Sequence, residues 1–354
     1  MKPTKDVLAF QKTRERRPPR PGDGDKVLWI RFGAFGDVLQ AAAAARLFKK
    51  KHPGVHLTFL TRPEYAGILR VQPYIDNLLL WDTRKRIGDF FKTVRETRQM
   101  SFDWLFSLHR DGLAALVSLF SRARWRCGYN RHLQFCYDAV HWEYLDALGV
   151  DFKNRDEAAI LTTREDRKKA RSILSELPEK KLFAVIGASK PQKFWPVRHW
   201  IEFLASLAME GWGIVLNGHG EPEARAAEEI GDTLKGREVP ESSVLNLVGR
   251  LPFPLMAAVA QKCRAAVGND TGPLHLAALT GTPTLGFFGV TDAYAMDYRM
   301  PWFREVKVTC PKAGCHNYNC PADCLADITP EKALQAFREF TSLDLLFDEG
   351  VFEN

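Results

Sequence analysis

Short apolar segments alternate with longer amphipathic or alanine-rich segments along most of the chain. The apolar segments are rich in aliphatic and aromatic residues, as expected of strands buried on both faces of a sheet. This alternation predicts an α/β fold in which crossover helices join parallel strands. The strands that we expect are 26–31, 55–60, 77–81, 104–108, 181–186, 213–217, 244–247, 265–268 and 284–288. The helices that we expect are 37–51, 113–120, a helical segment headed by 164–169, 196–210, 223–235, 254–262, 273–280 and 330–340.

The pattern runs twice, and a highly charged segment between residues 151 and 181 separates the two series. Two doubly wound domains that face each other across a central cleft are the simplest architecture with this order of elements. We expect a flexible basic arm at 1–25, an N-terminal domain at 26–160 and a C-terminal domain at 161–328. A helix and tail at 329–354 complete the chain and can pack back on the N-terminal domain.

Positive charge is concentrated near the N-terminus. The chain carries 50 Lys and Arg against 43 Asp and Glu, and its first 26 residues hold eight of the former and four of the latter. This arm is either a solvated tail or a segment that rests on an anionic membrane surface. No apolar run approaches the roughly 20 residues that cross a bilayer, and no secretion signal is recognisable. We therefore expect a cytoplasmic protein.

Seven cysteines do not make a disulfide framework in a chain of 354 residues. Four of them are Cys310, Cys315, Cys320 and Cys324. Their spacings are loosely compatible with a zinc site, but the two pairs lack the intervening stretch of roughly 12 to 20 residues that usually lets them fold around one ion. We expect buried free thiols and no metal.

The segment from Gly268 to Gly289 is the most informative motif. An apolar run ends at Gly268 and is followed by Asn-Asp-Thr-Gly, and Pro273 then supplies a backbone angle that suits the first turn of a helix. The unpaired N–H groups of that turn and the Thr271 hydroxyl favour binding of an anion such as a diphosphate. The alternative is an ordinary helix start that Asp270 or Thr271 caps.

A second motif follows the first predicted strand. Two glycines, Gly33 and Gly36, allow the backbone to approach a ligand, and Asp37 comes at the start of a helix. Asp37 is either a capping residue or a general base that takes the proton of a sugar hydroxyl as its oxygen attacks an anomeric carbon. One side chain can have both roles.

Two further loops follow predicted strands and carry polar side chains. Ser189 and Lys193 follow the strand at 181–186, and a lysine there can neutralise the charge on a leaving diphosphate, although one surface lysine is weak evidence. Glu221 and Glu223 follow the strand at 213–217; either can hold ribose or sugar hydroxyls.

Three motifs in this order resemble glycosyltransferase family 9, the heptosyltransferases of lipopolysaccharide core synthesis. They are Gly36-Asp37-Val38-Leu39, Lys193-Phe194-Trp195-Pro196, and Asp270 to Ala278 followed by Gly281-Thr282-Pro283-Thr284. The resemblance extends from about residue 26 to 340. It implies a GT-B fold with two facing Rossmann-like domains, an N-terminal acceptor domain and a C-terminal donor domain.

The resemblance also implies a reaction, which is metal-independent, inverting transfer of heptose from ADP-heptose to the lipopolysaccharide inner core on Kdo-lipid A. Asp37 would be the catalytic base and Lys193 would contact the donor phosphates. The remaining donor-binding residues would be Ser189, Glu223, Leu251, Asp270, Thr271, Gly272 and His275, with Leu251 near the adenine. No cofactor and no nucleic acid are expected.

The acceptor's carboxylates and phosphates suit guanidinium groups. Arg62 and Arg110 each follow a predicted strand, so we expect them beside Gly36 on the acceptor side. The chain departs from the family pattern at Gly33-Ala34, where serines are common, and at Gln40, where a histidine is common. Three alternatives therefore stay open: another sugar donor or acceptor, a non-catalytic nucleotide-sugar-binding protein, and a nucleotide-sugar epimerase.

Overall fold

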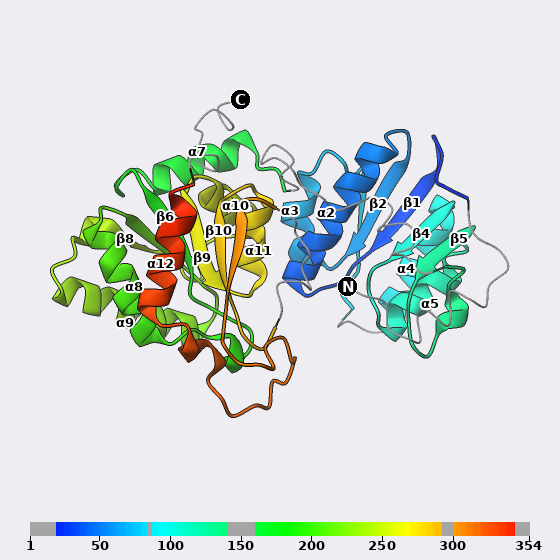
Figure 1. The fold of residues 1–354 in the computed structure, drawn as a ribbon. Coiled ribbons are helices and arrows are strands. Elements are labelled where there is room, and N and C mark those ends of the chain that lie inside the picture. Colours follow the sequence, from blue (N-terminus) through cyan, green and yellow to red (C-terminus); the bar gives the residue numbers. More distant parts are fainter. Residues whose placement is uncertain (1–18, 84–86, 140–159, 292–299, 344–354) are drawn as a thin grey trace. The chain divides into compact units, whose positions relative to one another are not determined.

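The computed structural model describes residues 19–83, 87–139, 160–291 and 300–343. The chain divides into two compact units, residues 1–150 and 151–354, which we call the N-terminal and C-terminal units (Figure 1). Most of the basic arm expected at 1–25 lies outside the described residues. Among the helices in the described parts of the chain, none combines the length and apolar character needed to span a membrane.

The N-terminal unit is built on a five-stranded sheet in the order β3-β2-β1-β4-β5, and every pairing is parallel. Its strands are β1 (Lys26–Ile30), β2 (His56–Thr61), β3 (Asn77–Leu80), β4 (Trp104–Ser107) and β5 (Trp125–Gly128). Its helices are α2 (Phe35–Lys51), α3 (Ala66–Arg70), α4 (Ile87–Met100) and α5 (Gly112–Phe120).

Both faces of this sheet are buried. Trp29 of β1 contacts Phe48 of α2 and Phe106 of β4, with ring centroids 5.4 and 5.2 Å apart. The alanine run of α2 is buried, because small side chains allow a helix to lie close to a sheet. A second cluster, which includes Leu28 and Phe32, packs with residues of α4 and α5. The central strands therefore hold their carboxyl ends in fixed positions.

The C-terminal unit contains a six-stranded parallel sheet in the order β11-β10-β9-β6-β7-β8, which is the strand order of a Rossmann fold. Its strands are β6 (Lys181–Val185), β7 (Gly213–Asn217), β8 (Val244–Asn246), β9 (Ala265–Asn269), β10 (Thr284–Phe288) and β11 (Phe303–Lys307). Its helices are α7 (Arg164–Ile173), α8 (Val197–Met209), α9 (Glu221–Gly236), α10 (Phe253–Gln261), α11 (Gly272–Leu279) and α12 (Pro330–Thr341).

Gly268 shows how closely the central strands of this sheet approach. A Cβ atom added at Gly268 of β9 would lie 2.5 Å from the Val185 Cβ and 2.6 Å from the Val185 carbonyl oxygen on β6. The strands can adopt this spacing only because position 268 has no side chain. Trp195, Trp200 and Phe287 fill one face of the sheet as a buried aromatic cluster.

The structure confirms the predicted α/β fold and every strand expected from the sequence, with ends that differ by one residue or so. The sequence interpretation missed β5, β11, α3 and α4. It also differs from the structure at the C-terminal helix, which we expected to be able to pack on the N-terminal domain. Instead, α12 belongs to the C-terminal unit, where Phe337 lies 5.8 Å from Phe203 and 5.1 Å from Trp212, ring to ring.

Candidate active site

Charged side chains of the N-terminal unit gather where its strands end. Arg31 follows β1, Arg62 follows β2, and His109, Arg110 and Asp111 follow β4. The three strands are neighbours and parallel, so their carboxyl ends lie at one edge of the sheet, the edge at which open α/β sheets bind ligands.

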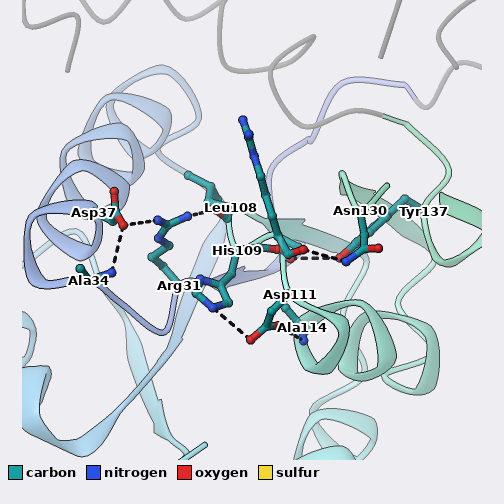
Figure 2. Close-up of polar contacts among 11 residues, drawn as sticks. Arg31, Ala34, Asp37, Leu108, His109, Asp111, Ala114, Asn130 and Tyr137 are labelled. Carbon is teal, nitrogen blue, oxygen red and sulfur yellow. Dashed lines mark hydrogen bonds and ion pairs between the residues drawn. The ribbon is translucent and has the colours of Figure 1, made fainter. Parts of the chain in front are cut away.

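Asp37 lies in the first turn of α2, as the sequence predicts. Its Oδ2 accepts a hydrogen bond of 2.9 Å from the Ala34 backbone N–H and forms an ion pair of 2.5 Å with Arg31 Nη2. Figure 2 shows both contacts ending on the same carboxylate oxygen. The side chain is 41% exposed, so Asp37 helps to cap the helix and still presents a carboxylate to solvent. The two roles left open by the sequence are compatible here.

Arg31 is the partner of Asp37 that sequence reasoning missed. A second nitrogen of its guanidinium donates to the Leu108 carbonyl oxygen, so the side chain ties the loop after β1 to the loop after β4. The only sequence signal for this role is the position of an arginine directly after a buried strand.

Asp111 caps the next helix. Its Oδ1 accepts a 2.7 Å hydrogen bond from the Ala114 N–H at the start of α5, and its Oδ2 lies 3.1 Å from His109 Nε2 (Figure 2). Burial acts to raise the pKa of Asp111, but the hydrogen bonds from His109 and Ala114 and the charge of Arg31 outweigh it. The pKa therefore lies below its ordinary value, and the carboxylate is ionised at neutral pH.

The two arginines that we expected at the acceptor side occupy this edge in different surroundings. Arg62 Nη2 donates to the Tyr65 hydroxyl at 2.8 Å, and its Nε lies 3.3 Å from Glu64 Oε1. A side chain at Gly33 would collide with this guanidinium. Burial, and then the charge of Arg31, lowers the pKa of Arg110, which nevertheless stays a cation because arginine is not deprotonated in proteins. Gly36 precedes Asp37 in the same turn.

In the C-terminal unit the motif after β9 is organised around Asp270, which is 7% exposed. Lys193 Nζ lies 2.6 Å from its Oδ2, His275 Nε2 lies 2.8 Å from its Oδ1, and the Thr291 hydroxyl donates to Oδ2 at 2.5 Å. Burial alone would raise the pKa of Asp270, but the hydrogen bonds and charges of His275 and Lys193 hold it well below its ordinary value. The carboxylate is thus ionised at neutral pH, and it positions Lys193 and His275.

Asn269 fixes the loops on either side of Asp270. Its Oδ1 accepts from the Trp195 backbone N–H at 3.1 Å, and its Nδ2 donates to the Ile186 carbonyl at 2.9 Å. Sequence reasoning missed Asn269 and Thr291. The signal for Asn269 is an amide side chain at the buried end of a strand, where it must find partners.

Thr271 is the N-cap residue of α11, but its side chain caps no backbone N–H of that helix. Its hydroxyl donates instead to the Asn269 carbonyl at 3.3 Å. In the first turn Pro273 has no N–H, and the Leu274 and His275 N–H groups donate to the Thr271 carbonyl, at 3.1 and 3.2 Å. The Gly272 N–H is therefore the donor of this turn that suits an anion. The side-chain cap that we considered for Thr271 is therefore not formed, and anion binding at this turn stays a prediction.

The structure distinguishes Glu221 from Glu223, between which the sequence offered no choice as a hydroxyl-binding residue. Glu221 is exposed and pairs with Arg225 on the surface of α9. Glu223 is 7% exposed, and a Cβ atom at Gly187 would lie 2.6 Å from its Cγ. Glu223 therefore lies against the loops that follow β6 and β7. Ser189 is exposed in the loop after β6. Leu251 lies in the loop after β8, where the Gly249 N–H donates a hydrogen bond of 3.0 Å to the Gly218 carbonyl.

All seven cysteines are free thiols. The expectation of burial is wrong for the cysteine-rich loop: Cys310 and Cys315 are exposed and Cys320 and Cys324 are half-buried, because the loop extends from the sheet as a series of turns. Within the described ranges, no group of three or more His, Cys, Asp or Glu side chains is arranged to hold a metal ion.

Comparisons with known proteins agree with these motifs. The family model of glycosyltransferase family 9 (heptosyltransferase) matches residues 140–326. Lipopolysaccharide heptosyltransferase 2 of Escherichia coli strain K12 is 28% identical over 349 residues, which cover 88% of this chain and 97% of the relative.

Two solved structures have the same fold. A glycosyl transferase family 9 protein from Veillonella parvula superposes with a TM-score of 0.74 at 16% identity, over 90% of this chain and 98% of the other. The E. coli ADP-heptose lps heptosyltransferase II superposes with a TM-score of 0.73 at 20% identity, over 90% and 99%. The predicted fold class, GT-B with two Rossmann-like domains, is confirmed. The chain belongs to glycosyltransferase family 9, the heptosyltransferase family, and is a glycosyltransferase.

Proposed function

We propose that this enzyme transfers heptose from ADP-heptose to the inner core of lipopolysaccharide, on an acceptor of the Kdo-lipid A type, with inversion at the anomeric carbon. Family membership and the names of the relatives, which are lipopolysaccharide heptosyltransferases, support the donor and the acceptor class. One relative of known structure is an ADP-heptose lps heptosyltransferase, which supports the same donor. No metal or cofactor takes part in the proposed reaction.

The geometry of Asp37 carries the proposal. Arg31 and the Ala34 N–H hold one carboxylate oxygen, Oδ2, and the part of the chain that the structure describes provides no hydrogen-bond partner for Oδ1. Oδ1 is therefore the atom that accepts the proton of the acceptor hydroxyl. As the hydroxyl oxygen bonds to the anomeric carbon, the bond from that carbon to the diphosphate oxygen breaks, and ADP leaves.

The C-terminal unit supplies the donor site. The Gly272 N–H at the start of α11, together with Thr271, binds the diphosphate, and Lys193 neutralises the charge that develops on it. Asp270 keeps Lys193 and His275 in place. In this proposal Ser189 lies near the phosphates, Leu251 near the adenine, and Glu223 binds hydroxyl groups of the donor.

Arg62, Arg110 and the backbone at Gly36 bind the acceptor, whose carboxylates and phosphates match guanidinium groups. We also propose that the enzyme acts in the cytoplasm, at the inner face of the inner membrane where its lipid-linked acceptor lies. The basic arm would favour that surface.

Release of ADP from ADP-heptose, with and without Kdo-lipid A, tests the function. We expect acceptor-dependent release by the wild type, and at least about 100-fold slower release by Asp37→Asn, because general-base catalysis typically contributes 10²- to 10⁴-fold. Asp37→Asn should still bind ADP. Glu221→Gln, at an exposed acid on α9, is the matched control. ADP binding without any turnover would favour a non-catalytic binding protein, and turnover of the donor without an acceptor would favour an epimerase.

A further inference from the structure

Exposed apolar side chains gather on one face of the N-terminal unit. In the described parts of the chain six large apolar side chains are exposed, and four of them belong to α4, α5 and the single turn Gln134–Cys136 that follows β5. The four are Phe91, Leu113, Phe120 and Phe135. Apolar side chains exposed one by one are ordinary, whereas a group of them marks an interaction surface. The proposed mechanism gives none of the four a task.

Helix α5 has no polar outer side. Its only polar side chain, Ser118, is buried, whereas Leu113 and Phe120 are exposed and Leu116 is half-buried. These three apolar side chains lie on one side of the helix, because residues three, four and seven positions apart share a face. The opposite side packs on the sheet through Val117. A helix that is apolar all round is normally covered on every side, so the outer side of α5 is suited to an apolar environment.

The exposed side chains of α4, α5 and the following turn form one surface. Phe90 lies 5.5 Å from Phe91 on its own helix and 6.2 Å from Phe120 on α5, ring to ring. Figure 1 shows the two helices side by side. The turn that carries Phe135 packs against α5 through Cys136, which lies in one buried cluster with Ala115. We call this surface the α4–α5 face and define it by Phe91, Leu113, Leu116, Phe120 and Phe135.

Exposed arginines border the α4–α5 face. Arg95 and Arg98 follow Phe91 on one side of α4, at spacings of four and seven residues. Arg98 Nε donates to the Phe120 carbonyl oxygen at 2.7 Å, which places this cation at the end of α5. Of the acids on α4, Glu96 lies 3.9 Å from Lys92. The four exposed arginines beside the face are Arg95, Arg98, Arg122 and Arg124.

Apolar side chains bordered by arginines match the surface of a membrane that contains anionic lipids. At such a surface aromatic side chains leave water for the boundary of the acyl chains, while arginines meet lipid phosphates. A second copy of this chain fits less well, because a symmetric contact through this face would bring the same arginines against one another. The formal charge of the chain, +7, also favours an anionic surface.

We propose that the α4–α5 face docks on an anionic lipid bilayer, with its phenylalanines in the headgroup region and the bordering arginines on lipid phosphates. The inference rests on the proposed function, because it names the surface through which an enzyme with a lipid-linked acceptor meets the membrane. Helix α5 begins directly after Asp111, at the edge of the sheet where Arg110 is proposed to bind the acceptor. Docking therefore brings that edge close to the lipid that carries the acceptor.

Sedimentation of the full-length protein with lipid vesicles tests the apolar part of the proposal. We expect the wild type to bind vesicles of phosphatidylethanolamine and phosphatidylglycerol at least about tenfold more tightly than neutral phosphatidylcholine vesicles. Phe91→Ser/Phe135→Ser should bind the anionic vesicles at least about tenfold more weakly than the wild type, because two aromatic side chains no longer leave water. Both positions are more than 60% exposed, so thermal unfolding should not change. Met209→Ser/Leu343→Ser, at two exposed positions of the C-terminal unit, is the matched control.

A second pair of variants tests the arginines. Arg95→Gln/Arg124→Gln should lower the affinity for the anionic vesicles about 25-fold at low salt, because each cation near such a surface contributes about fivefold. Lys168→Gln/Arg171→Gln removes the same charge from α7 of the C-terminal unit and should bind as the wild type does. Equal losses in the two variants would show that net charge and not the α4–α5 face governs binding, and would overturn the proposal.

Release of ADP with a soluble, deacylated Kdo acceptor distinguishes failure of this inference from failure of the proposed function. Weaker vesicle binding by Phe91→Ser/Phe135→Ser, with unchanged release on the soluble acceptor, would support the α4–α5 face. The same loss of binding in a protein whose wild type releases no ADP with any acceptor would support the face and refute the transfer reaction. Unchanged vesicle binding by this variant, or no binding by the wild type, would refute the proposal. A wild-type dimer that the two substitutions dissociate in analytical ultracentrifugation would also refute it, because the face would then bind a second copy.

Discussion

Lys193 and Asp270 come from loops on different strands, and the lysine donates two hydrogen bonds to the aspartate. Nζ lies 2.6 Å from the carboxylate and 3.1 Å from the backbone carbonyl oxygen of the same residue. The pair is mostly buried, with side chains 15% and 9% exposed. The ammonium group is thus held in place by the residue that precedes Thr271, the N-cap of α11.

Replacing Lys193 should damage both folding and turnover. Lys193→Met leaves the buried Asp270 carboxylate with fewer partners, so we expect the free energy of unfolding to fall by about 2 kcal/mol. We expect kcat to fall at least about 100-fold, because the charge on the leaving diphosphate is no longer neutralised. Urea unfolding and ADP release measure the two effects. Lys193→Arg, which keeps the charge, should lose less activity; equal losses would argue against an electrostatic role.

The ionisation of Asp270 should make the free energy of unfolding depend on pH. Its pKa in the folded protein is below the ordinary value of 3.8, so this group adds stability that is fully present above about pH 5 and is lost as the pH falls toward and below 3.8. The unfolding free energy of Asp270→Asn should therefore fall less steeply than that of the wild type between pH 5 and about pH 3. Urea titrations at several pH values test this, and parallel curves would contradict it.

Arg31 should affect turnover through Asp37. Arg31→Met removes the ion pair that holds one carboxylate oxygen, and a base that is free to rotate is a poorer catalyst. We expect kcat to fall roughly 10- to 100-fold, with ADP affinity unchanged. Steady-state kinetics and ADP binding measure this. Arg225→Met, which removes a surface ion pair on α9, should have no effect on either quantity.

Gly268 should not tolerate a side chain. Gly268→Ala places a Cβ within 2.6 Å of the Val185 backbone, so we expect the unfolding free energy to fall by about 3 kcal/mol. Gly231→Ala is the matched control: no atom lies within 4 Å of the added Cβ, and alanine favours helix, so stability should rise by about 0.5 to 1 kcal/mol. Thermal and urea unfolding of both variants check the contrast.

Arg110 should contribute to binding of the acceptor and not to binding of the donor. Arg110→Ala removes a partly buried cation from the acceptor edge, so we expect the KM for Kdo-lipid A to rise roughly tenfold, in line with the loss of a charged hydrogen bond. The KM for ADP-heptose should not change. A rise in both values would point to a structural role, for which circular dichroism and thermal unfolding are the check.

The sequence predicted the fold well because the central strands of parallel sheets are continuous apolar runs. β11 was missed because three of its five residues, Arg304, Glu305 and Lys307, are charged, and β11 is an edge strand that one neighbour pairs. β5 was missed for a similar reason: Trp125–Gly128 has only four residues, and one of them is the charged Arg126. α4 was missed because its apolar positions are diluted by charged ones.

Site residues could be predicted where their position next to a predicted strand identifies them. Contacts between residues far apart in the sequence could not be predicted. Asp37, Lys193 and Asp270 stand out because they follow predicted strands. The link from Arg31 to the Leu108 carbonyl joins residues 77 positions apart, and that from Asp270 to Thr291 joins residues 21 apart. Only the packing of the strands decides which of these side chains meet.

Asn269 has a consequence for how the donor side responds to a ligand. Its amide bonds at once to the segment that carries Lys193 and to the end of β6, while its own backbone leads directly into Asp270. A displacement of the segment that carries Lys193 would therefore also move the start of α11. In the proposed donor site, the groups that would meet a diphosphate are thus already tied together by Asn269 before any nucleotide arrives.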